Sequence, residues 1–231
     1  MIIGSGLLAQ AFAPAFSQRD DVCIYAAGVS NSGCNDTREF ERERKRLHEA
    51  LRQMSQADVF VYFGTCSVID PDAQDTPYVR HKLAMEQLVA AHSHYLILRL
   101  PQVAGKTPNP HTLLNYLYAR ISRSEAFSLW RNARRNIIDV ADVAAIAGFL
   151  IADPAARNNT FNIANPVCYT MSDIVAVMEN VVGKRAIYEI VERGTGYAID
   201  TRAILPVLDA AGVKFGDDYL ERVTRKYYGN S

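Results

Sequence analysis

The sequence predicts an α/β protein in which a parallel sheet is covered by helices on both faces. Short apolar stretches with strand character alternate with longer amphipathic stretches along most of the 231 residues. Residues 57–63 are apolar apart from Asp58, which is typical of a central parallel strand buried on both faces. A glycine-rich turn, Gly4-Ser5-Gly6, joins the first apolar stretch to the first helix. These observations predict a doubly wound sheet.

Composition excludes several classes of protein. Hydrophobic residues make up 49% of the chain and charged residues 22%, as in an ordinary globular domain. Lys and Arg together number 25, as do Asp and Glu, so no excess charge favours nucleic acid or a membrane surface. No apolar run reaches the roughly 18 to 20 residues of a membrane helix, and the stretch 1–16 lacks the basic start of a signal peptide.

The cysteines predict a reducing compartment and no metal site. Four of them stand far apart, without a Cys-x-x-Cys pair or a histidine at metal-binding spacing: Cys23, Cys34, Cys66 and Cys168. We therefore expect a cytoplasmic protein whose cysteines are free thiols.

The first strand and helix carry a candidate pyrophosphate site. Residues 1–3 are predicted as a short strand, and the turn continues through Leu7 and Leu8 into a helix that runs to about Phe16. Residues 4–9 read G-x-G-x-x-A, a turn in which backbone N–H groups at a helix N-terminus can approach a pyrophosphate. Such turns are common, and this one alone is weak evidence.

The second predicted strand, residues 21–28, lacks a feature that dinucleotide-binding proteins usually have. An acidic residue about 20 positions beyond the glycines normally binds the adenosine ribose. Here that place reads Ala26-Ala27-Gly28. The expected ribose ligand is absent from the sequence.

A long charged helix is predicted over residues 38–55, with Asp36 or Thr37 as its N-cap. Its apolar stripe consists of Phe40, Leu47, Leu51 and Met54, which face either the sheet or a second copy of the chain. The remaining positions are predicted to form a solvated face of mixed charge: Glu39, Glu41, Arg42, Glu43, Arg44, Lys45 and Arg46.

A tyrosine and a lysine on the next helix form the candidate catalytic centre. The strand at 57–63 ends in Gly64-Thr65-Cys66-Ser67, and a helix is predicted from Tyr78 to about Ala91, with Pro77 at its start. Tyr78 and Lys82 lie four positions apart, on one face of this helix. A nearby ammonium lowers the pKa of a phenol, which suits Tyr78 for proton transfer.

The second half of the chain continues the alternation and adds an arginine cluster. We predict strands at 95–100, 127–130, 159–164 and 187–191, and helices at 112–121, 142–151, 172–182 (capped by Ser172), 201–211 and 219–227. Arg131, Arg134 and Arg135 follow Trp130 closely. Arginine forks suit phosphate recognition, although such residues can also simply decorate a surface.

Taken in order, these motifs resemble the extended short-chain dehydrogenase/reductase family, which includes NAD-dependent nucleotide-sugar epimerases, dehydratases and 4-keto reductases. The resemblance spans nearly the whole chain. It rests on residues 4–9, 26–28, 65–68, Tyr78-x-x-x-Lys82, 98–105 (LRLPQVAG), 135–143 (RNIIDVADV) and 161–163 (FNI). It implies a Rossmann-like sheet, shortened here because the two strands that carry the adenosine-binding edge are missing.

The resemblance also implies roles for individual residues. Tyr78 would be the acid/base, Lys82 would lower its pKa and bind the nicotinamide ribose, and Thr65, or else Ser67, would hold the substrate oxygen. The residues implied for NAD or NADP are Gly4, Ser5, Gly6, Leu7, Leu8, Ala27, Gly28, Lys82 and Pro101. Those implied for the substrate are Ser67, Gln102, Trp130, Arg131 and Arg135, with Arg135 gripping the diphosphate of a nucleotide sugar.

The expected function is an NAD(P)-dependent reaction on a nucleotide sugar, in surface polysaccharide or deoxysugar biosynthesis. Dehydration is least favoured, because Cys66-Ser67 stands where dehydratases of this family carry an acid pair. Reduction and epimerisation stay open, and the alternative is a non-catalytic dinucleotide- or nucleotide-sugar-binding module. We expect a dinucleotide-binding core at 1–105 and 136–165 and a substrate lobe at 106–135 and 166–231. A homodimer is one of the oligomeric states that stay open.

Overall fold

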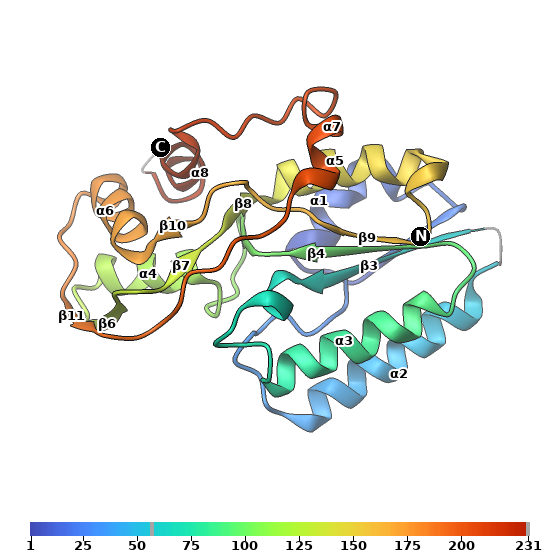
Figure 1. Cartoon of the computed structure of the whole chain (residues 1–231), viewed down its shortest axis with the longest axis horizontal. Coiled ribbons are helices and arrows are strands. Elements are labelled where there is room, and N and C mark those ends of the chain that lie inside the picture. The colour runs from blue at the N-terminus through green and yellow to red at the C-terminus, as the bar shows by residue number, and fades with distance from the viewer. Residues whose placement is uncertain (56–57, 230–231) are drawn as a thin grey trace.

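The fold is a five-stranded parallel sheet with a smaller lobe at one end (Figure 1). The structure is a computed structural model that describes residues 1–55 and 58–229, so the predicted strand start at Ala57 lies outside the described residues. The sheet order is β1 (Ile2–Ile3), β2 (Val22–Tyr25), β3 (Val59–Thr65), β4 (Tyr95–Leu100) and β9 (Asn159–Asn162), and each neighbouring pair is parallel.

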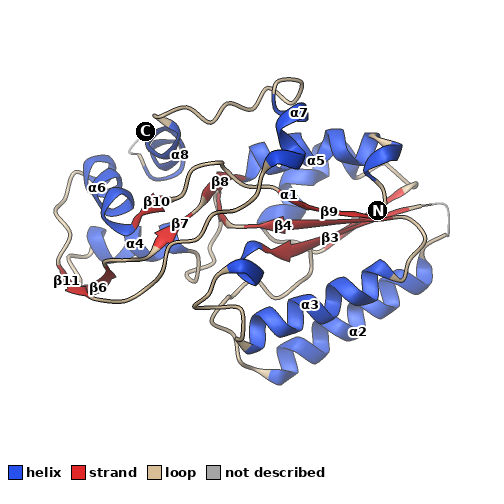
Figure 2. Ribbon diagram, viewed as in Figure 1, coloured by secondary structure: helices blue, strands red, loops and turns tan. Residues whose placement is uncertain are grey.

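Helices cover both faces of this sheet, as predicted (Figure 2). On one face lie α1 (Leu7–Phe16) and α5 (Val140–Ala152), and on the other lie α2 (Thr37–Gln53) and α3 (Pro77–Ala90). The strands between them are apolar on both sides because both faces are buried. The apolar stripe of α2 packs against the sheet and α3, so it is not a free surface for a second copy.

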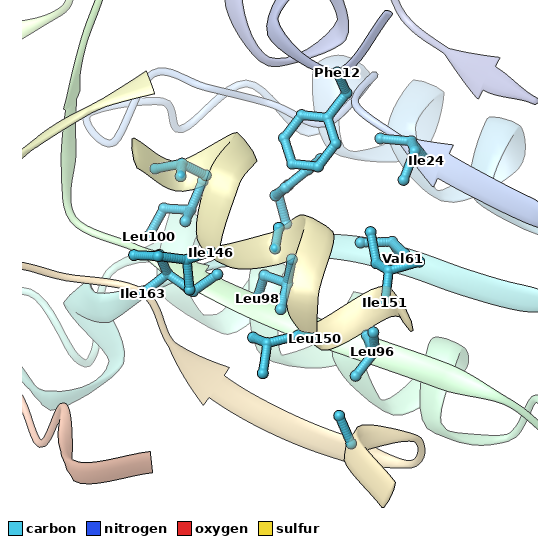
Figure 3. Close-up of a cluster of buried hydrophobic side chains, with 14 of the residues drawn as sticks. Phe12, Ile24, Val61, Leu96, Leu98, Leu100, Ile146, Leu150, Ile151 and Ile163 are labelled. Atoms are coloured by element: carbon cyan, nitrogen blue, oxygen red, sulfur yellow. The ribbon is translucent and has the colours of Figure 1, made fainter. Parts of the chain in front are cut away.

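The larger hydrophobic core lies between the sheet and the α1/α5 layer (Figure 3). Phe12 of α1 is completely buried and meets Phe63 of β3 edge-on, with 5.3 Å between the ring centroids. Leu96 and Leu98 of β4 point at the same layer, where Ile146 of α5 covers them. This packing sets the position of α1, whose N-terminus begins directly after the glycine turn.

The smaller lobe has its own core, formed by helices and short strand pairs. The helices are α4 (Leu113–Ser122), α6 (Met171–Val182) and α8 (Tyr219–Tyr228). The strand pairs are β5 (Gln102–Ala104) with β8 (Ile137–Asp139), β6 (Phe127–Trp130) with β11 (Tyr188–Val191), and β7 (Arg134–Arg135) with β10 (Tyr169–Thr170). The pair of β5 and β8 joins the lobe to the large sheet, because β5 follows β4 directly and β8 leads into α5.

Two predicted elements differ in the structure. The helix predicted at 201–211 is a 3₁₀ turn, Arg202–Ile204, followed by the short α7, Leu205–Leu208, and it packs on α5 instead of the lobe core. Helix α6 begins at Met171 and is capped by Thr170, not Ser172, because Thr170 and Asp173 form a reciprocal capping box. The division into two domains stays a prediction, and the segment 202–213 belongs by packing to the larger core.

The sheet order agrees with the prediction that two strands are missing. The common dinucleotide-binding order is 3-2-1-4-5-6, in which the first strand has neighbours on both sides. In the described part of the chain β1 pairs only with β2. Removing the second and third strands from the common order leaves 1-4-5-6, which corresponds to β1 through β4 here.

The handedness of the connections through α1 and α2 also differs from that of the common fold. From β1 to β3 the strands advance in one direction across the sheet, yet α1 and α2 lie on opposite faces. The two crossovers therefore have opposite hands, although parallel crossovers are right-handed in about 98% of cases. In the common order the chain reverses direction between these helices, so both crossovers can be right-handed.

We expect Phe12→Ala to destabilise the fold by about 3–5 kcal/mol, because it leaves a cavity between α1 and the sheet. Denaturant unfolding monitored by circular dichroism measures this change. The matched control is Phe149→Ala on α5, whose side chain is 43% exposed and whose loss should have little effect. Equal losses for the two variants would contradict the assignment of the core.

Candidate active site

A cleft of about 850 Å³ opens at the carboxyl ends of the parallel strands. Its walls come from the glycine turn, the ends of β2, β3 and β4, the first turn of α3 and the lobe. All nine residues predicted to bind the cofactor line it: Gly4, Ser5, Gly6, Leu7, Leu8, Ala27, Gly28, Lys82 and Pro101. The fold thus brings together segments that are far apart in the sequence.

The glycine turn has the geometry of an anion site. Gly4 adopts φ +129°, and a Cβ there would lie 2.4 Å from the Ala26 carbonyl oxygen, so only glycine fits between the two strands. Gly6 caps α1 without a side-chain hydrogen bond, and the first turn of α1 holds no acidic residue. The N–H groups at this end of α1 are therefore available to a negatively charged group.

Thr65 and Tyr78 meet at the floor of the cleft. Thr65 is the last residue of β3, and its hydroxyl accepts a hydrogen bond from the Ser67 N–H at 3.1 Å. Thr65 and Tyr78 both line the cleft, and Thr65 lowers the pKa of the Tyr78 phenol. Tyr78 sits in the first turn of α3, which Thr76 caps by accepting from the Val79 N–H. Tyr78 is only 7% exposed, so its hydroxyl contacts the cleft and little bulk water.

Lys82 is buried next to Glu43, a residue that sequence reasoning had placed on the solvated face of α2. Both side chains are almost inaccessible, with Lys82 3% and Glu43 0% exposed. The Lys82 ammonium donates to Glu43 Oε1 at 3.3 Å, and its Nζ lies 4.5 Å from the centre of the Tyr62 ring. The prediction of a solvated Glu43 was wrong, because α2 turns this residue towards α3 and the strand ends.

Glu43 accepts hydrogen bonds from several elements at once. Oε1 also accepts from the Tyr62 hydroxyl at 2.8 Å, while Oε2 accepts from the Val29 N–H at 2.6 Å and lies 2.9 Å from His81 Nε2. Burial alone would raise the pKa of the Glu43 carboxyl. The hydrogen bond from His81, the charge of Lys82 and the bonds from Val29 and Tyr62 outweigh burial and lower this pKa to about 2.

The expected effect of Lys82 on Tyr78 is not found. Burial raises the pKa of Tyr78 well above its ordinary value, the hydrogen bond with Thr65 lowers it, and the charge of Glu43 raises it further. Burial also lowers the pKa of Lys82, and the charge and hydrogen bond of Glu43 oppose that change. Because Glu43 compensates the ammonium, Tyr78 does not face an unbalanced positive charge.

Gly28 lies against the ion pair of Glu43 and Lys82, where a side chain would have little space. A Cβ on Gly28 would lie 2.9 Å from Glu43 Oε1 and 3.0 Å from Lys82 Nζ. Any larger residue would push the two charged groups out of place. The sequence predicted Gly28 as a cofactor contact, and the structure adds a second reason for its small size.

The other end of the cleft holds polar and cationic groups. Ser67, Gln102 and Arg135 line the cleft, as expected of the substrate side. Gln102 and Arg135 also border a second hollow of about 320 Å³ that His111 and Tyr116 complete. These residues place amide, imidazole, guanidinium and aromatic groups at one end of the site.

Trp130 and Arg131 do not belong to this end of the cleft. Alternate residues of β6 are buried, so Phe127 and Leu129 face the lobe core and Trp130 faces outwards, 37% exposed. Arg131 forms an ion pair with Glu192 at 3.0 Å on the same outer side. The structure therefore does not bring these two residues to the cleft, because alternate residues of a strand point to opposite sides. Their role as substrate ligands stays a prediction.

Two further residues line the cleft although no local sequence pattern predicted them. Tyr197 reaches the cleft from the segment after β11, and Asn109 reaches it from the loop before α4. Glu43 could have been suspected, because it lies three positions after Phe40 and four before Leu47 on the apolar stripe of α2. Its charge concealed this spacing.

Over the described ranges, 1–55 and 58–229, no helix is long and apolar enough to cross a membrane. The same ranges contain no group of three or more His, Cys, Asp or Glu side chains that could hold a metal ion.

Comparison with known proteins identifies the family. Residues 8–164 match the model of the NAD dependent epimerase/dehydratase family, which is more than half of the chain. The chain belongs to this family. Its members are NAD-dependent enzymes of the nucleotide-sugar epimerase, dehydratase and reductase type, and the five-stranded sheet has the family's Rossmann-like fold. A search of curated protein sequences finds no match.

Solved structures share the fold at low sequence identity. UDP-glucuronic acid 4-epimerase from Bacillus cereus, in complex with UDP-glucuronic acid and NAD, aligns with a TM-score of 0.71 and 18% identity over 90% of this chain and 75% of its own. UDP-glucose 4-epimerase from Thermus thermophilus, in complex with NAD, aligns with a TM-score of 0.69 and 16% identity over 90% of this chain and 76% of its own. RMD from Pseudomonas aeruginosa, complexed with NADPH, aligns with a TM-score of 0.68 and 16% identity over 89% of this chain and 79% of its own.

The residues present fit two parts of the nicotinamide cofactor on which the family depends. The N–H groups at the start of α1 suit a pyrophosphate, and Thr65, Tyr78, Lys82 and Pro101 line the same cleft. On the other side of the glycine turn β1 is the edge strand among the described residues, so no neighbouring strand offers a ribose ligand there.

The lowered pKa of Glu43 predicts a specific acid sensitivity. Its contribution to stability is complete above the ordinary glutamate pKa of about 4.3 and is lost as pH falls from there to about 2. We expect Glu43→Gln to be less stable at pH 7, by about 3–5 kcal/mol. Below about pH 4 the native chain should lose this advantage, so the two curves of unfolding free energy should converge.

Urea unfolding at a series of pH values measures both curves. The control is Glu41→Gln on the exposed side of α2, which should follow the native curve throughout because Glu41 is exposed and its ion pair with Arg44 lies at the surface. A constant difference between Glu43→Gln and the native chain from pH 7 to about pH 2 would contradict the assigned ionisation.

Proposed function

We propose that the chain is an NAD(P)-dependent enzyme that reduces or epimerises a nucleotide-activated sugar at C4, in a pathway of surface polysaccharide or deoxysugar biosynthesis. The observation that carries this proposal is that Thr65, Tyr78 and Lys82 line one cleft together. The glycine turn borders one end of that cleft and Arg135 the other. Family membership supports the class of reaction, and the bound ligands of the similar structures support the class of substrate.

In this proposal each side chain performs one task. The nicotinamide, when bound, supplies or accepts the hydride at the sugar carbon. Tyr78 donates a proton to the sugar oxygen or removes one from it, and Thr65 holds that oxygen in line with the phenol. Gln102 and Arg135 orient the substrate from the far end, where the guanidinium can bind the diphosphate.

Two features distinguish this chain within the proposal. Dehydration needs further acid/base groups beside the sugar, and the positions after Thr65 are Cys66, which is buried, and Ser67. The high pKa of Tyr78 supports a protonated phenol at neutral pH, which is the form that donates a proton during reduction of a keto sugar. Both features support reduction over dehydration.

A non-catalytic binding module is the second candidate. It is favoured by the open adenosine side, where β1 has no outer neighbour among the described strands. Such a module would bind a nucleotide sugar through Arg135 and the second hollow and would carry out no hydride transfer.

Tyr78→Phe should fold normally and lose at least about 100-fold in turnover of a keto sugar, the lower end of what general acid catalysis supplies. Steady-state kinetics with UDP-, dTDP- and GDP-linked 4-keto sugars and NADPH or NADH measure the loss. Tyr95→Phe, at the opposite end of β4, is the matched control and should keep native turnover. Near-native turnover by Tyr78→Phe would refute the assigned role.

Nicotinamide fluorescence separates the two candidates without a known substrate. We expect NADH or NADPH to bind to the native chain, and Gly4→Ala to weaken binding by at least about tenfold. The reason is that a Cβ at Gly4 clashes with Ala26 and costs about 1–3 kcal/mol of backbone strain. Gly33→Ala, in an exposed loop, should bind like the native chain. No binding of either cofactor at millimolar concentration would favour the binding module.

A further inference from the structure

Glu43 is a buried carboxylate that the reaction described above does not use. It lies beneath the cleft and does not border it, so it does not touch a bound molecule. Its four partners come from β3, from α3 and from the loop after β2. Two of the three candidate catalytic residues, Tyr78 and Lys82, stand on the helix that it contacts.

Structure alone gives little reason for a charge at this position. A buried ion pair is often no more stable than apolar residues of the same volume, because both charges lose their hydration. The core between α2, α3 and the sheet also holds buried apolar side chains, among them Leu47, Met85 and Val89. An apolar residue at position 43 would continue this packing but would leave Lys82 without a counter-ion.

We propose that Glu43 is a positioning residue for the candidate catalytic pair: its contact of 3.3 Å with Lys82 Nζ holds the ammonium in place beside the cleft, so that Tyr78 stands next to an ion pair and not next to a lone cation. The importance of this role for turnover rests on the proposed function. The Gly28 backbone supports the proposal from geometry, because a Cβ there would lie 2.9 Å from Glu43 Oε1 and 3.0 Å from Lys82 Nζ and would displace the pair.

The charge of Glu43 acts in the same direction on Lys82 and on Tyr78. A carboxylate favours the protonated form of every titratable group near it, and Glu43 raises the pKa of Lys82 and of Tyr78 alike. Removing its charge must therefore make both groups lose their protons at lower pH. A role limited to holding α2 against α3 makes no such prediction.

Several other ionisable groups face this network, and the experiment has to keep them constant. They are Arg42 and Arg46 on α2, Tyr25 on β2, Cys34 in the loop before α2, Tyr62 on β3, His81 and Glu86 on α3, and Arg99 on β4, which pairs with Glu86.

The test follows the two groups directly by NMR on the whole chain. With six lysines and 12 tyrosines in the sequence, ¹³C labels at lysine Cε and tyrosine Cζ give few signals. Lys82→Met and Tyr78→Phe assign the two that matter. We expect both titration midpoints to move down in Glu43→Gln, by about one pH unit or more for Lys82, which loses a neighbouring opposite charge.

Two variants control the measurement. Glu41→Gln removes a carboxylate from the exposed face of the same helix and should leave both midpoints unchanged. Glu43→Asp keeps the charge on a shorter side chain and should restore most of both shifts. Unchanged midpoints in Glu43→Gln, or equal shifts in Glu41→Gln, would overturn the proposal.

A second comparison covers the case in which Glu43→Gln does not fold. Lys82→Met combined with Glu43→Gln carries neither buried charge, so it avoids the cost of an unpaired ammonium. The Tyr78 midpoint should be lower in this double variant than in Lys82→Met alone. Equal midpoints would overturn the proposal in the same way.

Cofactor affinity shows whether the role matters for the proposed function. Glu43→Gln and Lys82→Met should each weaken NADPH or NADH binding, and the double variant should be no weaker than Lys82→Met, because Glu43 acts through Lys82. Additive losses would overturn this coupling. If the native chain binds neither cofactor, the proposed function fails, while the NMR titrations still decide the proposal about Glu43.

Discussion

The parallel arrangement of the strands is the constraint on which the rest of the molecule depends. Because β1, β2, β3 and β4 all run in one direction, their carboxyl ends meet at one edge of the sheet, and each brings its following loop to the same place. The glycine turn, Gly28, Thr65 and Pro101 reach the cleft for this reason alone. The two helical layers then bury both faces and hold the strand ends in register.

The buried pair of Glu43 and Lys82 links this scaffold to its chemistry. It joins α2 to α3 directly beneath the cleft, through a carboxylate whose ionised state depends on further donors from β3, from α3 and from the loop after β2. A neutral pair beside Tyr78 produces a different site from a lone ammonium, since the phenol retains its proton to higher pH. The same interaction thus contributes to stability and to the protonation state of the candidate acid.

The shortened sheet leaves β1 as an edge strand next to the glycine turn. The glycine turn and the residues Thr65, Tyr78 and Lys82 line one cleft, while β1 has no outer neighbour among the described strands. The opposite hands of the crossovers through α1 and α2 fit the loss of two strands between them, because the helices kept their faces while the strands became neighbours.

Local patterns in the sequence were sufficient to predict the alternation of strands and helices, the glycine turn and the placement of Tyr78 and Lys82 on one face of α3, since each depends on residues a few positions apart. The strand at 95–100 and the first turn of α3 illustrate this. Only the tertiary structure decided that Glu43 is buried and that Trp130 and Arg131 face away from the cleft. Those outcomes depend on how α2 and β6 rotate against distant segments, and a charged or aromatic side chain does not reveal that rotation by itself.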